Sequence, residues 1–276
     1  MNMHRAVLGF TTIAALVSSS VGAQWLKYPT TGIPRLSNGQ PDLSAPAPRT
    51  PDGRPDLTGL WTTADREVLF NLARTLDPSA VEMTPWAAAI QKQRESREHV
   101  DDPVGYCLPH GTPRILFTDG GFKILTTPSV TAFLHEAGAY STFREVFTDG
   151  RPFPEIAEPT WFGYSIGRWD ADTFVVESTG FRDRGWLDTE KGRPHSDALL
   201  VIQQFRRVDF GHMDVTITID DAKAYLKPWT IRAAFVLRPD TELLESSCEA
   251  HDKTMEHRRI APPPPEPPSP PLPERR

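Results

Sequence analysis

One short segment of the chain carries the side chains of an acid/base catalyst. The sequence Pro-His-Ser-Asp at residues 194–197 comes just before an expected strand, and its His195 can exchange a proton near neutral pH. A Ser-His-Asp triad within three consecutive residues is excluded because adjacent side chains do not converge. Catalysis by His195 therefore needs a carboxylate from another strand, for which Glu136 and Asp172 are the candidates. The alternative is that the serine and aspartate cap a turn while the imidazole binds backbone.

A second group of residues combines carboxylates with guanidinium groups. Glu136 and Arg144 lie on two expected neighbouring strands, and Asp149 and Arg151 lie on the Asp-Gly turn that follows. Guanidinium groups bind carboxylate or carbonyl groups through paired hydrogen bonds, which makes Arg144 and Arg151 candidate substrate-binding residues. The same four side chains also fit a structural ion-pair network.

Metal chemistry has weaker support in the sequence. His110 lies in a loop rich in proline and glycine, where it is a candidate residue at the rim of a site. His110, His195 and Glu136 are suitable ligand types, but their spacing carries no metal signature, and we expect neither a metal nor a cofactor. Asp172, with Asp170, also fits a simple hairpin turn.

Aromatic side chains are dense between residues 161 and 229, and most of them are expected in the core. Those that face the lumen of a barrel would form the apolar wall of a small-molecule site. The aromatic candidates for ligand contact are Trp161, Tyr164, Trp186 and Tyr225. The sequence has no Gly-rich phosphate loop, Gly-x-Ser-x-Gly elbow or His-Glu-x-x-His motif, which disfavours nucleotide enzymes, α/β-hydrolases and zincins.

The first 23 residues have the pattern of a secretory signal peptide. A basic start ends at Arg5, residues 6–17 are largely apolar, and Val21-Gly22-Ala23 is a small-residue cleavage pattern. The apolar run is too short to cross a bilayer as a helix, which takes about 20 residues. We therefore expect a periplasmic or secreted protein without stable membrane insertion after cleavage.

Export determines how the two cysteines are interpreted. Cys107 and Cys248 are the only cysteines, and in an oxidising compartment they are expected to form a disulfide. A catalytic thiol at Cys107, with His110 three residues away, is the less favoured alternative. The net charge of −6 argues against nucleic-acid partners and leaves a small molecule as the expected ligand.

The chain divides into three regions that differ in composition and in expected structure. Residues 24–57 are interrupted by prolines and are expected to form an extended arm, and residues 58–249 form the expected barrel domain, with a helix over 85–98. Residues 250–276 form a tail that is expected to be disordered from residue 261, because its prolines lack backbone donors and it offers little to bury.

Period-two patterns dominate the central region, most clearly at residues 212–220, which place Met213, Val215, Ile217 and Ile219 on one face. We expect hairpins of 199–208 with 212–220 and of 164–169 with 173–178. Other strands are expected at 122–127, 130–136, 141–147, 230–237 and 242–248, with a further strand opening after residue 57. About nine short strands with one helix predict a mainly β fold, either an antiparallel barrel of the lipocalin/calycin type or a sandwich.

Six sequence blocks in this order resemble a group of uncharacterised secreted bacterial proteins. The blocks are PDLTGLW (55–61), CLPHGTPR (107–114), TDGRP (148–152), SIGRWDADT (165–173), PHSD (194–197) and AYLKPW (224–229). The resemblance supports a role for His195, and the Gly-x-Trp pattern at residues 59–61 is lipocalin-like, but no activity follows from it. The chain departs from the usual pattern at Ala171 and at residues 137–139.

Two functions from different classes are compatible with the sequence. The first is an exported enzyme, a lyase, isomerase or hydrolase, that acts on a small, partly apolar molecule through His195 with Glu136 or Asp172 and without a cofactor. The second is a non-catalytic, lipocalin-like binding protein that uses the same pocket. An imidazole beside a carboxylate in a pocket favours the enzyme, and a lumen without a paired titratable group favours binding. The sequence does not define the oligomeric state.

Overall fold

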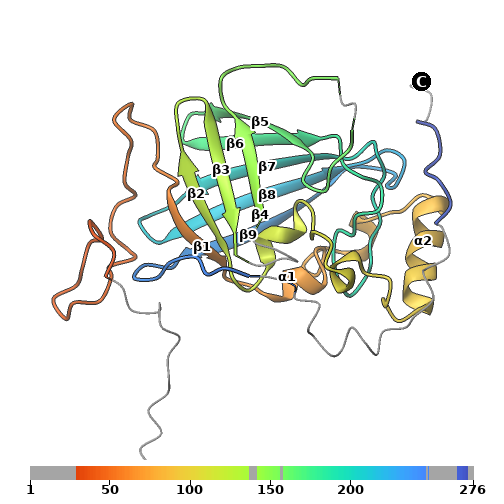
Figure 1. The fold of residues 1–276 in the computed structure, drawn as a ribbon, viewed down its shortest axis with the longest axis horizontal. Coiled ribbons are helices and arrows are strands. Elements are labelled where there is room, and N and C mark those ends of the chain that lie inside the picture. Colours follow the sequence, from red (N-terminus) through yellow and green to blue (C-terminus); the bar gives the residue numbers. More distant parts are fainter. Residues whose placement is uncertain (1–28, 137–141, 156–157, 247, 249–265, 273–276) are drawn as a thin grey trace, which may run out of the picture.

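Figure 1 shows the fold of a computed structural model that describes residues 29–136, 142–155, 158–246, 248 and 266–272. The expected signal peptide at residues 1–23 and the first residues of the expected arm lie outside the described residues.

Nine strands close into one barrel, in which each strand pairs with the next along the chain and β9 pairs back with β1. This confirms the predicted mainly β barrel. The strands are β1 Gly59–Thr63, β2 Phe122–Thr126, β3 Val130–His135, β4 Thr142–Phe147, β5 Tyr164–Asp170, β6 Thr173–Thr179, β7 Leu200–Arg207, β8 His212–Asp220 and β9 Trp229–Leu237. The hairpins β5–β6 and β7–β8 are those that the sequence predicts.

The prediction of a fully antiparallel barrel is wrong at one seam. β4 and β5 are parallel and share only two paired positions, Val146 with Ser165 and Phe147 with Ile166. The reason is the long connection over residues 148–163, which carries the chain back to the other end of the barrel before β5 begins, as a parallel pair requires. The expected strand at 242–248 is also wrong, because its described residues form no strand and β9 closes the barrel instead.

Helices are short apart from α2, Pro85–Ser96, whose first turn is capped by the Thr84 hydroxyl accepting from the Ala87 amide. The predicted helix ran to residue 98, but Glu98 and His99 have positive φ values of 53° and 58°, which end the helix. The other described helices are α1, Glu67–Phe70, and single 3₁₀ turns at Pro78–Ala80, Pro103–Tyr106 and Arg114–Phe117. No helix in the described residues is long and apolar enough to cross a membrane.

The two ends of the barrel are covered by different segments (Figure 1). The turns at 127–129, 171–172 and 208–211 lie at the end that the N-terminal arm covers, which we call the arm end. The connections at 180–199 and 221–228 lie at the opposite end, next to α2, which we call the α2 end. The 3₁₀ turn Arg114–Phe117 packs against the α2 end of the barrel. Three of its side chains are fully buried, and the ring of Phe117 contacts the ring of Phe235.

The described part of the N-terminal arm contains two similar turns. Arg35 and Arg49 each donate to the carbonyl of a glycine four residues later and then reach an aspartate at the arm end of the barrel. The two carboxylates are Asp240, which pairs with Arg35, and Asp172, which pairs with Arg49. Two ion pairs of the same construction therefore hold the arm to the barrel.

The C-terminal tail departs from the sequence expectation. Residues 266–272 lie along α2, although the sequence predicts disorder from residue 261 (Figure 1). Proline provides no backbone donor, but the Glu266 carboxylate and the Pro267 carbonyl both accept hydrogen bonds from α2. The apolar Leu272 remains 62% exposed, so polar contacts hold this segment instead of apolar burial.

The predicted disulfide joins Cys107 to Cys248, across a sequence separation of 141 residues. It ties the loop that leads to the α2 end of the barrel to the segment that follows β9. We expect the double substitution Cys107→Ala/Cys248→Ala to lower the free energy of unfolding by about 2–4 kcal/mol, because the open chain gains entropy in the unfolded state. Urea denaturation measures the change, and equal unfolding midpoints for the variant and the wild type would contradict it.

Candidate functional site

The lumen of the barrel contains a buried guanidinium group. Arg144 is 3% exposed and points inward from β4, because alternation along the strand places Phe143 and Glu145 outside. Its Nε donates to the Ser165 hydroxyl at 3.0 Å, its Nη1 to Oε1 of Gln203 at 2.7 Å, and its Nη2 to the Ser178 hydroxyl at 2.6 Å. Three further strands, β5, β6 and β7, therefore contribute one neutral oxygen each.

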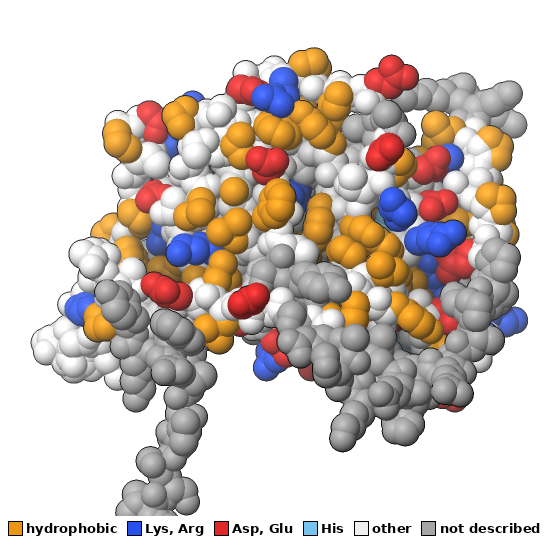
Figure 2. All heavy atoms as spheres, viewed as in Figure 1, with side chains coloured by type: hydrophobic (Ala, Val, Ile, Leu, Met, Phe, Trp, Pro, Cys, Tyr) orange, Lys and Arg blue, Asp and Glu red, His pale blue; other side chains and the backbone are white. Residues whose placement is uncertain are grey.

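Arg144 has no anionic partner in the described part of the chain. Burial lowers the pKa of Arg144 to about 9, which still leaves the guanidinium charged at neutral pH, and no carboxylate acts in the opposite direction. The outer surface differs, since Figure 2 shows acidic and basic side chains interspersed with hydrophobic ones. An ion removed from water without a counter-charge costs several kcal/mol, so this barrel interior is suited to an anion.

Two histidines lie near this charge. His135, at the end of β3, is 2% exposed, and both of its ring nitrogens lack a protein partner in the described structure. Burial, together with the positive charge of Arg144 and the nearby His110, lowers the pKa of His135 to about 3. Burial and the charge of Arg114 lower the pKa of His110 to about 4. Both imidazoles are therefore neutral at physiological pH, and each can donate one N–H.

Further unsatisfied polar atoms and aromatic rings complete this region. Nε2 of Gln203, Oγ1 of Thr142 and Nδ1 of His110 are buried without a partner among the described residues. The ring of Phe162 stacks on His135 with centroids 6.2 Å apart, and Phe122 lies 6.0 Å from the same imidazole. A charged group, neutral donors and flat apolar walls thus meet in one place, which we call the lumen site.

The structure places His195 outside the lumen site, in a cluster beside α2. Its Nδ1 lies 3.1 Å from the Ser196 carbonyl oxygen, its ring meets Phe181 edge-on, and burial lowers its pKa. The amide and hydroxyl of Ser196 both donate to Asp221, at 2.6 and 2.7 Å. Pro194, the first residue of the block, accepts from the Tyr225 hydroxyl at 2.8 Å. These contacts agree with the alternative to catalysis, in which residues 194–197 cap a turn and the imidazole binds backbone.

The two carboxylates expected to assist His195 lie elsewhere. Oε2 of Glu136 accepts from the Leu244 amide at 3.2 Å, and its side chain packs over Gly120. Asp172 lies in the β5–β6 turn, where it binds Arg49 of the arm through two hydrogen bonds. None of the described contacts of His195 involves either residue, so the structure does not bring the expected catalytic group together.

The expected substrate-binding residues fall into four places. Arg144 and His110 belong to the lumen site, whereas Trp186 and Tyr225 belong to the His195 cluster. Trp161 lies on the segment whose backbone approaches Gly111. The remaining two, Arg151 and Tyr164, lie on the outside of the barrel, where the guanidinium pairs with Asp149 and covers the ring of Phe147.

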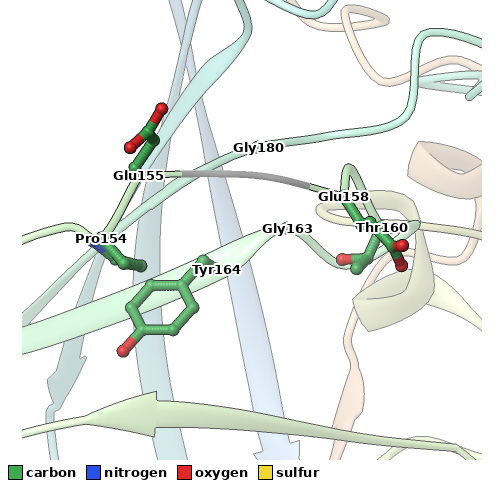
Figure 3. Close-up of a pocket in the computed structure, with 7 residues that line it drawn as sticks. All are labelled: Pro154, Glu155, Glu158, Thr160, Gly163, Tyr164 and Gly180. Atoms are coloured by element: carbon green, nitrogen blue, oxygen red, sulfur yellow. The ribbon is translucent and has the colours of Figure 1, made fainter.

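Tyr164 also lines a shallow surface pocket of about 200 Å³ at the start of β5 (Figure 3). Its other lining residues are Pro154, Glu155, Glu158, Thr160, Gly163 and Gly180. The two glutamates make this pocket acidic, so its charge is opposite to that of the lumen site. The described residues contain no cluster of three histidine, cysteine or acidic side chains able to hold a metal, and His110, His195 and Glu136 are not gathered into one.

The fold and the site together define a closed β-barrel with a cationic interior. No family model, curated protein or solved structure matches this chain. The resemblance of its sequence blocks to secreted bacterial proteins therefore stays a prediction.

Sequence reasoning missed His135, Gln203, Ser165 and Ser178. Each is buried on a strand, and all but Ser165, which lies between Gly163 and Gly167, have a buried apolar neighbour two residues away on the same face. The signal that could have found them is a polar residue at a position that alternation assigns to the buried face of a strand.

The buried imidazole of His135 predicts a pH dependence of stability. Its pKa is about 3 in the folded protein and near 6.5 in the unfolded chain, so only the unfolded state takes up this proton as the pH falls from 6.5 towards 4. Stability present above pH 6.5 is therefore lost on acidification, by about 1.4 kcal/mol per pH unit for this one group.

Urea unfolding of His135→Gln at pH 7, 6 and 5 tests this prediction, because the variant should lose stability less steeply than the wild type. Parallel slopes for His135→Gln and the wild type would show that His135 is accessible to protons in the folded protein.

Proposed function

We propose that the protein binds a small organic anion, a carboxylate with an apolar body, inside the barrel. The observation that carries this proposal is Arg144, a buried guanidinium whose three donor groups reach only neutral oxygens in the described part of the chain. A carboxylate entering the lumen site supplies the missing negative charge where little water screens it.

The donors around Arg144 suit such a head group. Neutral His135 and the amide of Gln203 each have an N–H without a protein partner among the described residues, and each can donate to a carboxylate oxygen. Hydrogen bonds to an ionised acceptor are roughly twice as strong as those between neutral groups. The rings of Phe122, Phe133 and Phe162 give an apolar body its contact surface.

The geometry favours binding over catalysis. The enzyme hypothesis requires an imidazole oriented by a carboxylate, whereas the described hydrogen-bond partner of His195 is the Ser196 carbonyl, and Asp221 and Asp183 act on it through their charge alone. Among the described residues neither imidazole of the lumen site hydrogen-bonds to a carboxylate, although the charge of Asp102 acts on His110, and their low pKa values make them weak bases. A site with one permanent charge and neutral donors recognises an anion without moving a proton.

The site of action that we propose is the periplasm or the extracellular space. The disulfide between Cys107 and Cys248 is stable in an oxidising compartment, and it supports export. The expected signal peptide provides the route.

Isothermal titration calorimetry with trans-cinnamate and with cinnamyl alcohol tests the proposal, since the two ligands differ mainly in their charged group. We expect cinnamate to bind the wild type, and Arg144→Met to weaken this binding by about 30-fold or more, because a buried charge pair is lost. Arg151→Met removes an arginine from the outer surface and should leave the affinity unchanged.

The variant Arg144→Lys keeps the positive charge but lacks the planar guanidinium that binds a carboxylate through two hydrogen bonds. Near-UV circular dichroism establishes that each variant is folded. Equal affinity of the wild type for the acid and the alcohol, or equal cinnamate affinity of folded Arg144→Met and the wild type, would contradict anion recognition by Arg144. Absence of binding to any member of a carboxylate series from benzoate to octanoate would contradict the binding function itself.

A further inference from the structure

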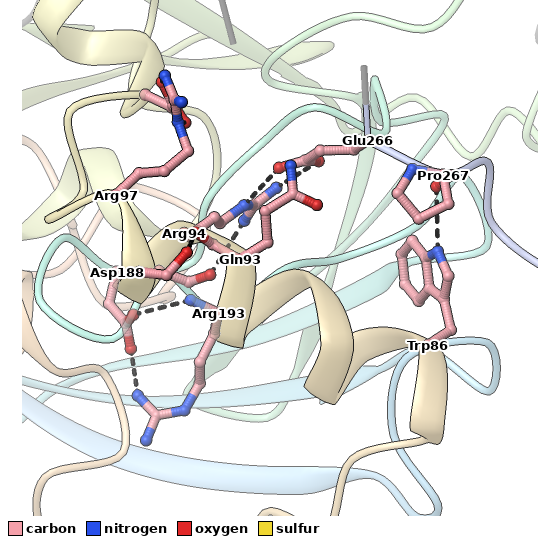
Figure 4. Close-up of polar contacts among 11 residues, drawn as sticks. Trp86, Gln93, Arg94, Arg97, Asp188, Arg193, Glu266 and Pro267 are labelled. Atoms are coloured by element: carbon pink, nitrogen blue, oxygen red, sulfur yellow. Dashed lines mark hydrogen bonds and ion pairs between the residues drawn. The ribbon is translucent and has the colours of Figure 1, made fainter. Parts of the chain in front are cut away.

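The C-terminal segment 266–272 makes specific contacts with α2 and its surroundings. The Glu266 carboxylate accepts two hydrogen bonds from Arg94, at 2.7 and 2.9 Å, and the indole N–H of Trp86 donates to the Pro267 carbonyl at 3.2 Å (Figure 4). Farther along, the Ser269 hydroxyl lies 3.3 Å from Asp197. We call Trp86, Arg94 and Asp197 the docking surface.

Arg94 also has partners in the body of the protein besides the tail. Its Nη1 donates to the Gly192 carbonyl at 3.0 Å, and its guanidinium lies 4.7 Å from the ring centroid of Trp186. The neighbouring carboxylate Asp188 is engaged by Arg193 and does not neutralise Arg94 (Figure 4). Two nitrogens of a held guanidinium are thereby presented in the fork geometry that matches a carboxylate.

The chemistry of these contacts is that of polyproline recognition. A proline-rich strand has no amide donors to offer, so a protein that binds it must donate to its carbonyl groups, and an indole N–H on an aromatic surface is a common way to do so. Trp86 provides this donor, and Arg94 adds selectivity for an acidic residue next to the proline. The low conformational freedom of polyproline reduces the entropic cost of binding.

We propose that the docking surface is a binding site for an acidic, proline-rich peptide segment of a partner protein, and that residues 266–272 occupy it as an intramolecular competitor. The tail is held by one two-pronged ion pair and two single hydrogen bonds, with little apolar burial. Such a contact is weak enough to be exchanged, and its linkage to the body through residues 249–265 makes it compete at a millimolar effective concentration.

The test uses full-length protein and a fluorescein-labelled peptide of residues 261–276, followed by fluorescence anisotropy. The variant Glu266→Gln weakens the protein's own tail and leaves the docking surface intact, so we expect it to bind the peptide at least about tenfold more tightly than the wild type. Glu274→Gln changes another glutamate of the same tail and is the matched control, for which we expect wild-type affinity.

Two further arms identify the surface that binds the peptide. On the Glu266→Gln background, Trp86→Phe keeps an aromatic ring but removes the N–H donor, and it should weaken peptide binding several-fold. A labelled peptide that itself carries glutamine at position 266 should bind at least about tenfold more weakly to the same protein.

Failure of Glu266→Gln to bind the peptide, or affinity equal to that of the wild type, would overturn the proposal and leave the tail as a purely structural strap. Insensitivity to both Trp86→Phe and the peptide substitution would place the peptide on another surface and overturn it as well. Near-UV circular dichroism of each variant separates these outcomes from loss of the fold.

Discussion

The structure depends on closing a barrel around a positive charge that no described residue neutralises. Arg144 is held by hydrogen bonds to Ser165, Ser178 and Gln203. These inward-facing polar side chains of β5, β6 and β7 all orient the same guanidinium group. Neutral oxygens satisfy its hydrogen bonds without cancelling its charge, and the surrounding phenylalanines exclude the water that would screen it. This arrangement is the basis of the anion binding that we propose for the interior.

The segments outside the sheet help to maintain that environment. The 3₁₀ turn Arg114–Phe117 closes the α2 end, and the disulfide restrains the loop that carries His110. At the arm end, the guanidinium of Arg207 lies 5.0 Å from the ring centroid of Trp61 and donates to the carbonyl groups of Asp56 and Phe210, so it links the end of β7 to the start of β1. Both ends are therefore shielded, and the charge of Arg144 acts in a medium of low polarity.

Much of the fold follows from local patterns, and the site does not. Alternation predicts the β7–β8 hairpin because each of its strands has one buried face, and the Thr84-Pro85 cap predicts the start of α2. The parallel seam between β4 and β5 depends on how residues 148–163 cross the barrel, which no local pattern encodes. His195 is a catalytic candidate in the sequence because it can titrate. In the structure its neighbours Ser196 and Pro194 bind Asp221 and Tyr225, so the segment has structural contacts. The convergence of Arg144 and His135 on one lumen is a property of closure and of strand register.

Diffraction from crystals soaked in 4-bromocinnamate would test the central claim most directly, because bromine scatters anomalously and marks the ligand. The account predicts a bromine peak inside the barrel and the carboxylate within about 3 Å of the Arg144 guanidinium. A bromine peak only outside the barrel, for example at the surface pocket beside Tyr164, with Arg144 still bound solely to Ser165, Ser178 and Gln203, would contradict it.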